Sequence, residues 1–206
     1  MNNSLRSFAV KTTFAAFTAL ACVASASATT LTTKLAVDNG YTAYLSTSAS
    51  TTGTQFSVGH DWTNVMTSSV ELGNAQTYFL QIAAYDDLNS AGLLGEFSLE
   101  GTGYHFADGS TKVLSGSSLL TGNIDGFNGN YTALTTIGNT SQWDSVSGID
   151  SAAQWVWSRW YDYDNVSFMS LTILADAPAD VPEPASLGLM GLGLLALSRI
   201  RARKSQ

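Results

Sequence analysis

Two short runs of acidic and amide side chains are the residues that could most readily hold an ion. Asp86-Asp87-Leu88-Asn89 and Asp162-Tyr163-Asp164-Asn165 each place several oxygen atoms in one turn, and Asp38-Asn39 adds more. Carboxylate and amide oxygens are the ligands that Ca²⁺ prefers. However, Asp and Asn are also ordinary turn formers, and the sequence has no complete EF-hand loop. Two alternatives stay open: a structural calcium held by Asp162 and Asp164, or plain turns. No other cofactor is expected.

Five tryptophans are the next residues that could bind a ligand, because an aromatic ring can stack on the apolar face of a sugar. Trp62, Trp143 and Trp160 sit beside predicted loops and are the candidate ligand-binding residues. Trp155 and Trp157 alternate around Val156, so we expect them to share one face of a strand and to pack in the core.

Catalytic chemistry has little support in the sequence. The region between the two chain ends has only two histidines, His60 and His105, and neither a cysteine nucleophile nor a Gly-x-Ser-x-Gly turn. Neither a hydrolase triad nor a His-based zinc site is indicated. A glycosidase needs only two carboxylates, which any two strands could supply, so that alternative stays open. We expect a protein that is not an enzyme and has no catalytic residues.

The charge balance argues against one class of partner. Residues 29–180 carry three cations (Lys34, Lys112 and Arg159) against fifteen carboxylates, a net charge of −12. Nucleic-acid binding requires a basic footprint, so no nucleic acid is expected as a partner. The only cysteine, Cys22, lies outside this region, so its stability must come from an ordinary core rather than from disulfides.

The C-terminal 26 residues have a three-part order. A Val181-Pro182-Glu183-Pro184 segment precedes an uncharged apolar stretch from Ala185 to Leu197, and Arg199, Arg201, Arg203 and Lys204 follow. Cations beyond an apolar segment favour the cytoplasmic side, so we expect a transmembrane helix with the rest of the chain outside. The prolines keep Glu183 extended, which is the form that a protease binds.

This tail resembles the PEP-CTERM sorting signal of Gram-negative, polysaccharide-producing bacteria. The resemblance implies processing by exosortase, a membrane-embedded cysteine protease-transpeptidase, with Val181, Pro182, Glu183 and Pro184 as the sorting motif. The helix and the basic tail would be discarded or left in the membrane. The alternative is a plain C-terminal membrane anchor.

The N-terminal 28 residues agree with export. Arg6 and Lys11 form a positive region, Phe14 to Val23 an apolar one, and Ala26-Ser27-Ala28 a small-x-small cleavage site. This order is typical of a secretory signal peptide, helical before removal, which signal peptidase would cleave after Ala28. The chain therefore divides into residues 1–28 (signal peptide), 29–180 (extracellular domain) and 181–206 (sorting and anchor segment).

The pattern of residues 29–180 is that of strands. Short runs rich in Val, Ile, Tyr, Phe and Thr alternate with Gly, Asn, Asp and Ser clusters, which predicts an all-β fold, an antiparallel β-sandwich of the jelly-roll kind. The expected strands are Leu31–Val37, Tyr41–Ser46, Gln55–Val58, Val65–Leu72, Thr77–Tyr85, Leu93–Glu100, Tyr104–Phe106, Lys112–Leu114, Ala153–Trp157 and Val166–Leu174. The gap from Ser115 to Ala152 would hold irregular strands, for instance around Tyr131–Ile137, or a flap.

A second resemblance covers about residues 35–175. The order of Val37–Leu45, Trp62, Val70–Gly73, Tyr78–Ala84, Ala91–Phe97 and Ala152–Trp157 looks like the galactose-binding-domain-like jelly roll of secreted carbohydrate-associated modules. The usual Asn-Gly turn is replaced here by Ser46-Thr47-Ser48. The resemblance implies the fold and, more remotely, sugar binding.

Two functions follow from these observations. The first is an exported, non-enzymatic protein of the cell surface or extracellular matrix, sorted by exosortase, held briefly in the inner membrane, and associated with exopolysaccharide in a biofilm. The second is a carbohydrate-binding module that recognises matrix polysaccharide. In both, the partners are signal peptidase, exosortase, the membrane before processing and extracellular polysaccharide.

Overall fold

The structure, a computed structural model, describes residues 28–73, 75–87, 90–137, 146–159 and 166–177, together with Gly191 and Gly193. The first five ranges contain strands, turns and loops and no helix. The strands are β1 (Thr29–Asp38), β2 (Gly40–Ser46), β3 (Thr54–Gly59), β4 (Met66–Leu72), β5 (Tyr78–Tyr85), β6 (Gly92–Glu100), β7 (Tyr104–Phe106), β8 (Lys112–Leu114), β9 (Thr121–Asn123), β10 (Thr132–Ala133), β11 (Thr135–Thr136), β12 (Val156–Trp157) and β13 (Val166–Ala175).

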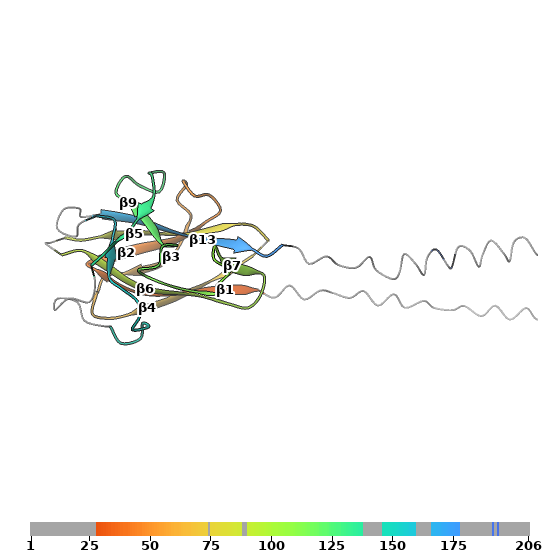
Figure 1. The fold of residues 1–206 in the computed structure, drawn as a ribbon, viewed down its shortest axis with the longest axis horizontal. Coiled ribbons are helices and arrows are strands. Elements are labelled where there is room, and N and C mark those ends of the chain that lie inside the picture. Colours follow the sequence, from red (N-terminus) through yellow and green to blue (C-terminus); the bar gives the residue numbers. More distant parts are fainter. Residues whose placement is uncertain are drawn as a thin grey trace, which may run out of the picture.

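The strands form two antiparallel sheets that face each other (Figure 1). Sheet A has the order β11-β12-β6-β1-β4, and β8 also pairs with β6. Sheet B has the order β10-β9-β13-β5-β2-β3, and β7 pairs with the end of β13. The predicted all-β antiparallel sandwich is confirmed at this level. In the described part of the chain, β4 is an edge strand of sheet A and β3 is an edge strand of sheet B, and these two edges lie next to each other.

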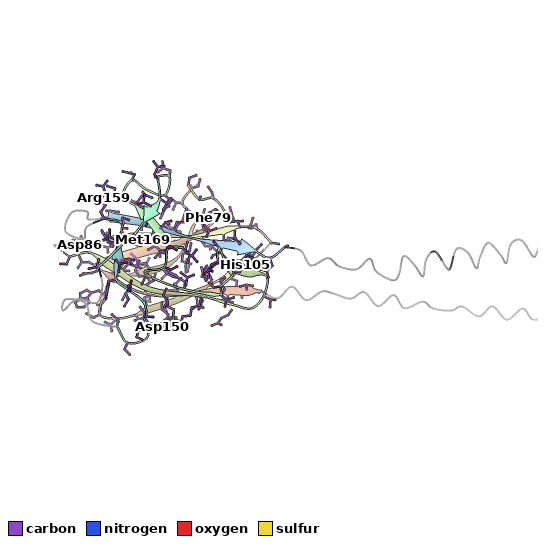
Figure 2. The ribbon with its side chains drawn as sticks, viewed as in Figure 1. Phe79, Asp86, His105, Asp150, Arg159 and Met169 are labelled. Atoms are coloured by element: carbon purple, nitrogen blue, oxygen red, sulfur yellow. The ribbon has the colours of Figure 1, made fainter. Side chains whose placement is uncertain are left out.

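The main core lies between the sheets and is built from side chains two residues apart. On β5, the predicted inward set of Tyr78, Leu80, Ile82 and Ala84 is buried in this core. On β6, Leu93, Phe97 and Leu99 face it as predicted, and Met169 of β13 lies between the sheets (Figure 2). Full burial of one large apolar side chain contributes about 1.5–3 kcal/mol. The alternation therefore fixes which face of each strand points inward.

A second apolar cluster lies on the outer face of sheet A. Ala36 and Leu94 are register partners on β1 and β6 and point away from the main core. Trp155 covers them, and its side chain is fully buried. The prediction that Trp155 and Trp157 share one face is wrong: both are buried, but Trp157 belongs to the main core. The reason is that only Val156–Trp157 is strand, so strand alternation does not extend to Trp155.

Residues 115–152, expected as a long irregular gap, contribute three short strands where they are described. β10 and β11 fall within the predicted Tyr131–Ile137 region, and β9 was not predicted. The part from 146 onward packs on the outer face of sheet A through Val146, Ile149 and Ala153. Residues 146–153 therefore form a cover layer on this face, with Asp150 on the outer side of sheet A (Figure 2).

An ion network holds this cover layer to the sheet. Glu96 of β6 is buried, and its carboxylate contacts Lys34 Nζ of β1 at 3.1 Å. Its other oxygen accepts the Asp150 backbone N–H at 3.0 Å. Lys112 of β8 lies 2.7 Å from the Asp150 carboxylate and 3.7 Å from Glu96. Two of the three cations in residues 29–180 are thus committed to Glu96 and Asp150.

The network shifts the pKa values of its members. Burial acts to raise the pKa of Glu96, but the Lys34 ammonium and the Asp150 N–H outweigh it and hold that pKa below its ordinary value. The Lys112 ammonium lowers the pKa of Asp150, and Asp150 raises that of Lys112. Both carboxylates therefore bind protons more weakly in the folded chain than in the unfolded chain.

No helix in the described part of the chain is long and apolar enough to cross a membrane. The predicted signal helix falls outside the described residues, as do Ala26, the Val181–Pro184 segment and all of the predicted C-terminal transmembrane helix except Gly191 and Gly193. Ala28, after which cleavage is predicted, is exposed and directly precedes β1.

We predict that Glu96→Gln lowers the free energy of unfolding at pH 7 by about 1–3 kcal/mol, the usual effect of losing hydrogen bonds to a buried charge. The wild-type chain should lose stability as the pH falls through the depressed pKa values of Glu96 and Asp150, below about pH 4. The variant should lose less over the same interval. Urea unfolding between pH 7 and pH 3 measures both effects.

The matched control for this prediction is Glu71→Gln, an exposed glutamate on the neighbouring edge strand β4. Its unfolding curve should stay close to that of the wild type at every pH. Equal acid sensitivity in the wild type and in Glu96→Gln would contradict the role given to the network.

Candidate functional site

The two ends of the sandwich carry different features. β1 begins and β13 ends at one end, which we call the tail end, because the sorting segment follows β13 (Figure 1). β1 ends and β2 begins at the other, which we call the far end. Asp86 and His105 mark the far end and the tail end respectively (Figure 2). Among the described residues that the sequence singled out as candidate ligands, Trp62, Asp38–Asn39 and Asp86–Asp87 lie at the far end.

Trp62 lies in the loop between β3 and β4, at the far end. Its side chain is half-buried and packs against the outer cluster around Trp155. The same cluster includes Val65 from the same loop. Part of the Trp62 surface is therefore used in packing, and the rest is exposed.

The polar side chains around Trp62 satisfy one another. The Asp61 carboxylate accepts hydrogen bonds from Thr63 N at 2.7 Å and Thr63 Oγ1 at 2.6 Å, and these bonds lower the pKa of Asp61. His60 Nδ1 lies 2.7 Å from the hydroxyl of Tyr85, the last residue of β5. His60 thus contacts Tyr85 and holds the end of β3 close to the end of β5.

A hydrogen bond joins the two loops that carry Asn39 and Asp87 at the far end. Asn39 Oδ1 accepts a hydrogen bond from Asp87 N at 2.7 Å, which joins the β1–β2 turn to the loop after β5. Within the described ranges, no group of three or more His, Cys, Asp or Glu side chains could hold a metal ion. Trp143, Trp160, Asp162 and Asp164 lie outside the described residues, so the predictions made for them stay predictions.

A hydroxyl relay joins the two sheets along the β3/β4 side. The Tyr41 hydroxyl on β2 is 2.9 Å from Ser57 Oγ on β3, and Ser57 Oγ is 2.8 Å from Ser68 Oγ on β4. Burial raises the pKa of Tyr41, which outweighs the opposite effect of its bond to Ser57, so the phenol stays protonated. The relay thus links an edge strand of sheet B to an edge strand of sheet A.

A groove of about 600 Å³ opens beside this relay, toward the tail end. Its apolar lining comes from four strands: Leu45 (β2), Phe56 (β3), Val70 (β4) and Tyr78 (β5). Leu45, Phe56 and Val70 are half-buried and continuous with the main core. The groove is therefore a place where the core reaches the surface between two sheet edges.

A bulge in β3 explains how Phe56 enters the groove. The pairing of β2 with β3 runs from Ala43↔Ser57 to Tyr44↔Gln55, so Phe56 has no partner on β2. An extra residue of this kind bends the strand and re-aims its side chain, and bulges are frequent at sheet edges and beside functional sites.

The opposite wall is the loop between β2 and β3. Seven of the nine residues from 46 to 54 are serine or threonine. The hydroxyl side chains that line the groove are Ser46, Thr47, Ser48, Thr51, Thr52 and Thr54. Thr47, Thr51, Thr52 and Thr54 are exposed, so the rim is open to solvent.

One buried side chain fixes the conformation of this wall. Gln81 of β5 is fully buried, and its Nε2 contacts the carbonyl oxygens of Ser48 at 3.2 Å, Ala49 at 3.3 Å and Thr51 at 3.2 Å. Its Oε1 accepts a hydrogen bond from Gly53 N at 3.1 Å. A Cβ on Gly53 would lie 2.1 Å from the Leu45 carbonyl oxygen, so the close approach of the two chain segments requires glycine there.

The groove offers hydrogen-bonding and apolar surface without charge. None of the described side chains that line it is charged, although the surrounding domain is strongly acidic. Such a site can hold a neutral ligand with hydroxyl groups on its edges and an apolar face, and its size is ordinary for a ligand pocket. Sequence reasoning missed it. The available signals were the run of hydroxyls from 46 to 54 and a glutamine inside an apolar strand.

The last strand is fastened at the tail end, directly before the sorting segment. The Asp176 N–H donates to the Gly103 carbonyl oxygen at 2.9 Å. The Asp176 carboxylate lies 2.6 Å from Nδ1 of His105 on β7. These contacts hold the chain to the sandwich up to Asp176.

A comparison with protein families identifies residues 180–204 as a PEP-CTERM protein-sorting motif. The chain therefore carries the sorting motif that its tail resembles, and the motif implies an exported protein sorted by exosortase, with a membrane-anchored signal before processing. Neither the curated proteins nor the solved structures contain a match to the chain. The galactose-binding-like character of the sandwich therefore stays a prediction.

We predict that Gln81→Leu releases the groove wall while leaving the sandwich intact. The variant loses the bonds to Ser48, Ala49, Thr51 and Gly53, so the free energy of unfolding should fall by about 1–3 kcal/mol. Amide hydrogen exchange measured by mass spectrometry should accelerate in residues 47–53 and stay unchanged in β1 and β6. Gln55→Leu, on exposed β3, is the matched control. Unchanged exchange in residues 47–53 of Gln81→Leu would show that another contact fixes the wall.

Proposed function

We propose that this chain is an exported, non-enzymatic protein of the cell surface or extracellular matrix, which exosortase processes and which then associates with exopolysaccharide. The observation that carries the proposal is the PEP-CTERM motif at residues 180–204, at the C-terminal end of a domain with its own core. The predicted signal peptide at residues 1–28 supports export by the same route. The product would be the sandwich of residues 29–180, free of both ends.

The composition of the domain supports an extracellular location. Its net charge of −12 favours solubility and suits a protein that must not bind the anionic membrane surface after release. It has no cysteine in residues 29–180, so its stability does not depend on the redox state of its compartment. Apolar packing in two clusters provides that stability instead.

The histidines support a structural rather than a catalytic role for the domain. His60 is held by the Tyr85 hydroxyl and His105 by the Asp176 carboxylate. Each of these contacts fastens the end of one strand to another. The proposal of a non-enzymatic function rests on these structural roles of the histidines. It rests also on the sequence of residues 29–180, which indicates neither a hydrolase triad nor a His-based zinc site.

The position of the sorting motif supports processing of the folded domain. Asp176 is held by His105 and by the Gly103 carbonyl oxygen, and six residues separate Asp176 from Glu183. A chain of that length spans at most about 20–25 Å when extended. Exosortase could therefore reach the Pro-Glu-Pro segment without unfolding the sandwich, while the domain stays close to the membrane.

A carbohydrate-binding module is the second candidate function. The observation that favours it is the uncharged groove between β3 and β4. In that case the domain would hold matrix polysaccharide at a defined site, rather than through its general surface.

We predict that Glu183→Ala stops sorting without affecting the fold. In the cells that make the protein, wild-type chain should be recovered from the surface, the polysaccharide fraction or the medium. Its mass should be that of a chain that ends near Pro182–Pro184. Full-length Glu183→Ala chain should accumulate in the membrane, because the protease has lost its recognition element. Mass spectrometry of each fraction measures both outcomes.

Glu71→Ala is the control for this experiment, since Glu71 is an exposed glutamate on β4, far along the chain from the sorting motif. Its fractionation should match the wild type. An intact C-terminus in every fraction of the wild-type protein would overturn processing. A processed chain found free of polysaccharide would overturn matrix association alone.

A further inference from the structure

We infer that the groove between β3 and β4 is a binding site for a neutral polysaccharide, with Phe56 against a sugar face and the Ser46–Thr54 loop against its hydroxyl groups. This inference rests on the polysaccharide association proposed above and names the site. It places the ligand at the tail end of the sandwich and not at Trp62, which lies at the far end.

Charge selects the class of sugar. The described groove side chains are all uncharged, and they lie in a domain with fifteen carboxylates and three cations. Lys34 and Lys112, two of those cations, are bound to Glu96 and Asp150 on the outer face of sheet A. An acidic polysaccharide would meet repulsion with no basic partner in the groove, whereas a neutral one would not.

The lining fits the two kinds of surface that a sugar ring presents. A pyranose has hydroxyl groups on its rim and C–H groups on its faces. Phe56, Val70 and Leu45 provide a half-buried apolar floor at the edge of the core, and the buried Tyr78 also lines the groove. Serine and threonine hydroxyls on the wall can both donate and accept hydrogen bonds, as sugar hydroxyls do. Dispersion contacts and hydrogen bonds would therefore act on the same ring.

The wall is ordered before any ligand arrives. Four backbone groups of the loop are bound by the buried Gln81 amide, and Ser46 Oγ donates to the Thr51 carbonyl at 2.8 Å. A loop held in this way loses little conformational freedom on binding, which strengthens affinity. The exposed rim at Thr47, Thr51 and Thr52 leaves the groove open to solvent, so a polymer can enter.

The test measures binding of neutral hexasaccharides to the processed protein recovered from cells. The probes are the β-1,4-linked hexamers of glucose, mannose and galactose, with hexagalacturonate as the acidic comparison, in isothermal titrations. At least one neutral hexamer should bind with a saturable curve, and hexagalacturonate should bind at least tenfold more weakly. Absence of binding by all three neutral hexamers, or tighter binding of hexagalacturonate, would overturn the inference.

Two substitutions locate the site. Thr52→Trp places a large ring on the exposed rim of the groove, and it should reduce affinity for the bound hexamer at least tenfold. Phe56→Ala removes the floor and should have a similar effect; its melting curve shows whether the fold survives. Thr67→Trp on β4, exposed on the opposite face of the strand from Val70, is the control and should change affinity less than twofold.

The outcomes separate this inference from the proposed function. If Thr52→Trp and Phe56→Ala bind the hexamer as the wild type does, the groove is not the site, although polysaccharide association stands. If the groove variants lose binding while Glu183→Ala is sorted normally, the site stands and exosortase processing at Glu183 fails.

Discussion

The hydroxyl relay from Tyr41 through Ser57 to Ser68 is the contact that joins the edges of the two sheets. From Ser57 to Gly59, toward the far end, β3 pairs with β2 in regular register. On the other side, the bulge at Phe56 interrupts that pairing, and the groove begins there. The relay therefore lies where the two sheet edges meet, directly beside the place where the half-buried side chains of Leu45, Phe56 and Val70 line the groove.

Charge is distributed in a way that gives the groove and the rest of the surface different roles. Glu96 and Asp150 hold Lys34 and Lys112 on the outer face of sheet A, where they fasten the cover layer. The two lysines thus neutralise two carboxylates and stabilise the cover layer. The remaining carboxylates give the domain its acidic character. An acidic domain that bears this uncharged groove is consistent with the proposed role among neutral polymers outside the cell.

The fold could be predicted well from the sequence because strand alternation is a local signal. β5 and β6 carry apolar residues at every second position, and their bounds and inward faces were predicted closely. β12 was mispredicted in extent and Trp155 in facing, because only Val156–Trp157 is strand and Trp155 instead packs on the outer face of sheet A, which is therefore also buried. A strand buried on both faces loses the contrast between its two sides. The cover layer that causes this burial comes from residues far along the chain, which no local pattern reveals.

The sorting motif could also be predicted, since its three parts are contiguous in sequence. The groove could not, because Leu45, Phe56, Val70 and Tyr78 come from four strands whose neighbours depend on the pairing of whole sheets. Its wall depends on Gln81, a residue that looks like an isolated polar interruption of an apolar strand until the loop is seen around it. Sequence reasoning favoured tryptophans instead, because aromatic residues are visible without knowledge of pairing.

The most direct measurement of the central claim is an NMR titration of the processed protein with fragments of polysaccharide from its own matrix. Aromatic side-chain shifts report on the two ends of the sandwich separately. The account predicts that the Phe56 and Tyr78 rings shift in proportion to bound fragment, while the Trp62 indole at the far end stays unchanged. A shift of Trp62 with no change at Phe56 and Tyr78 would contradict it and would place the ligand among the far-end loops.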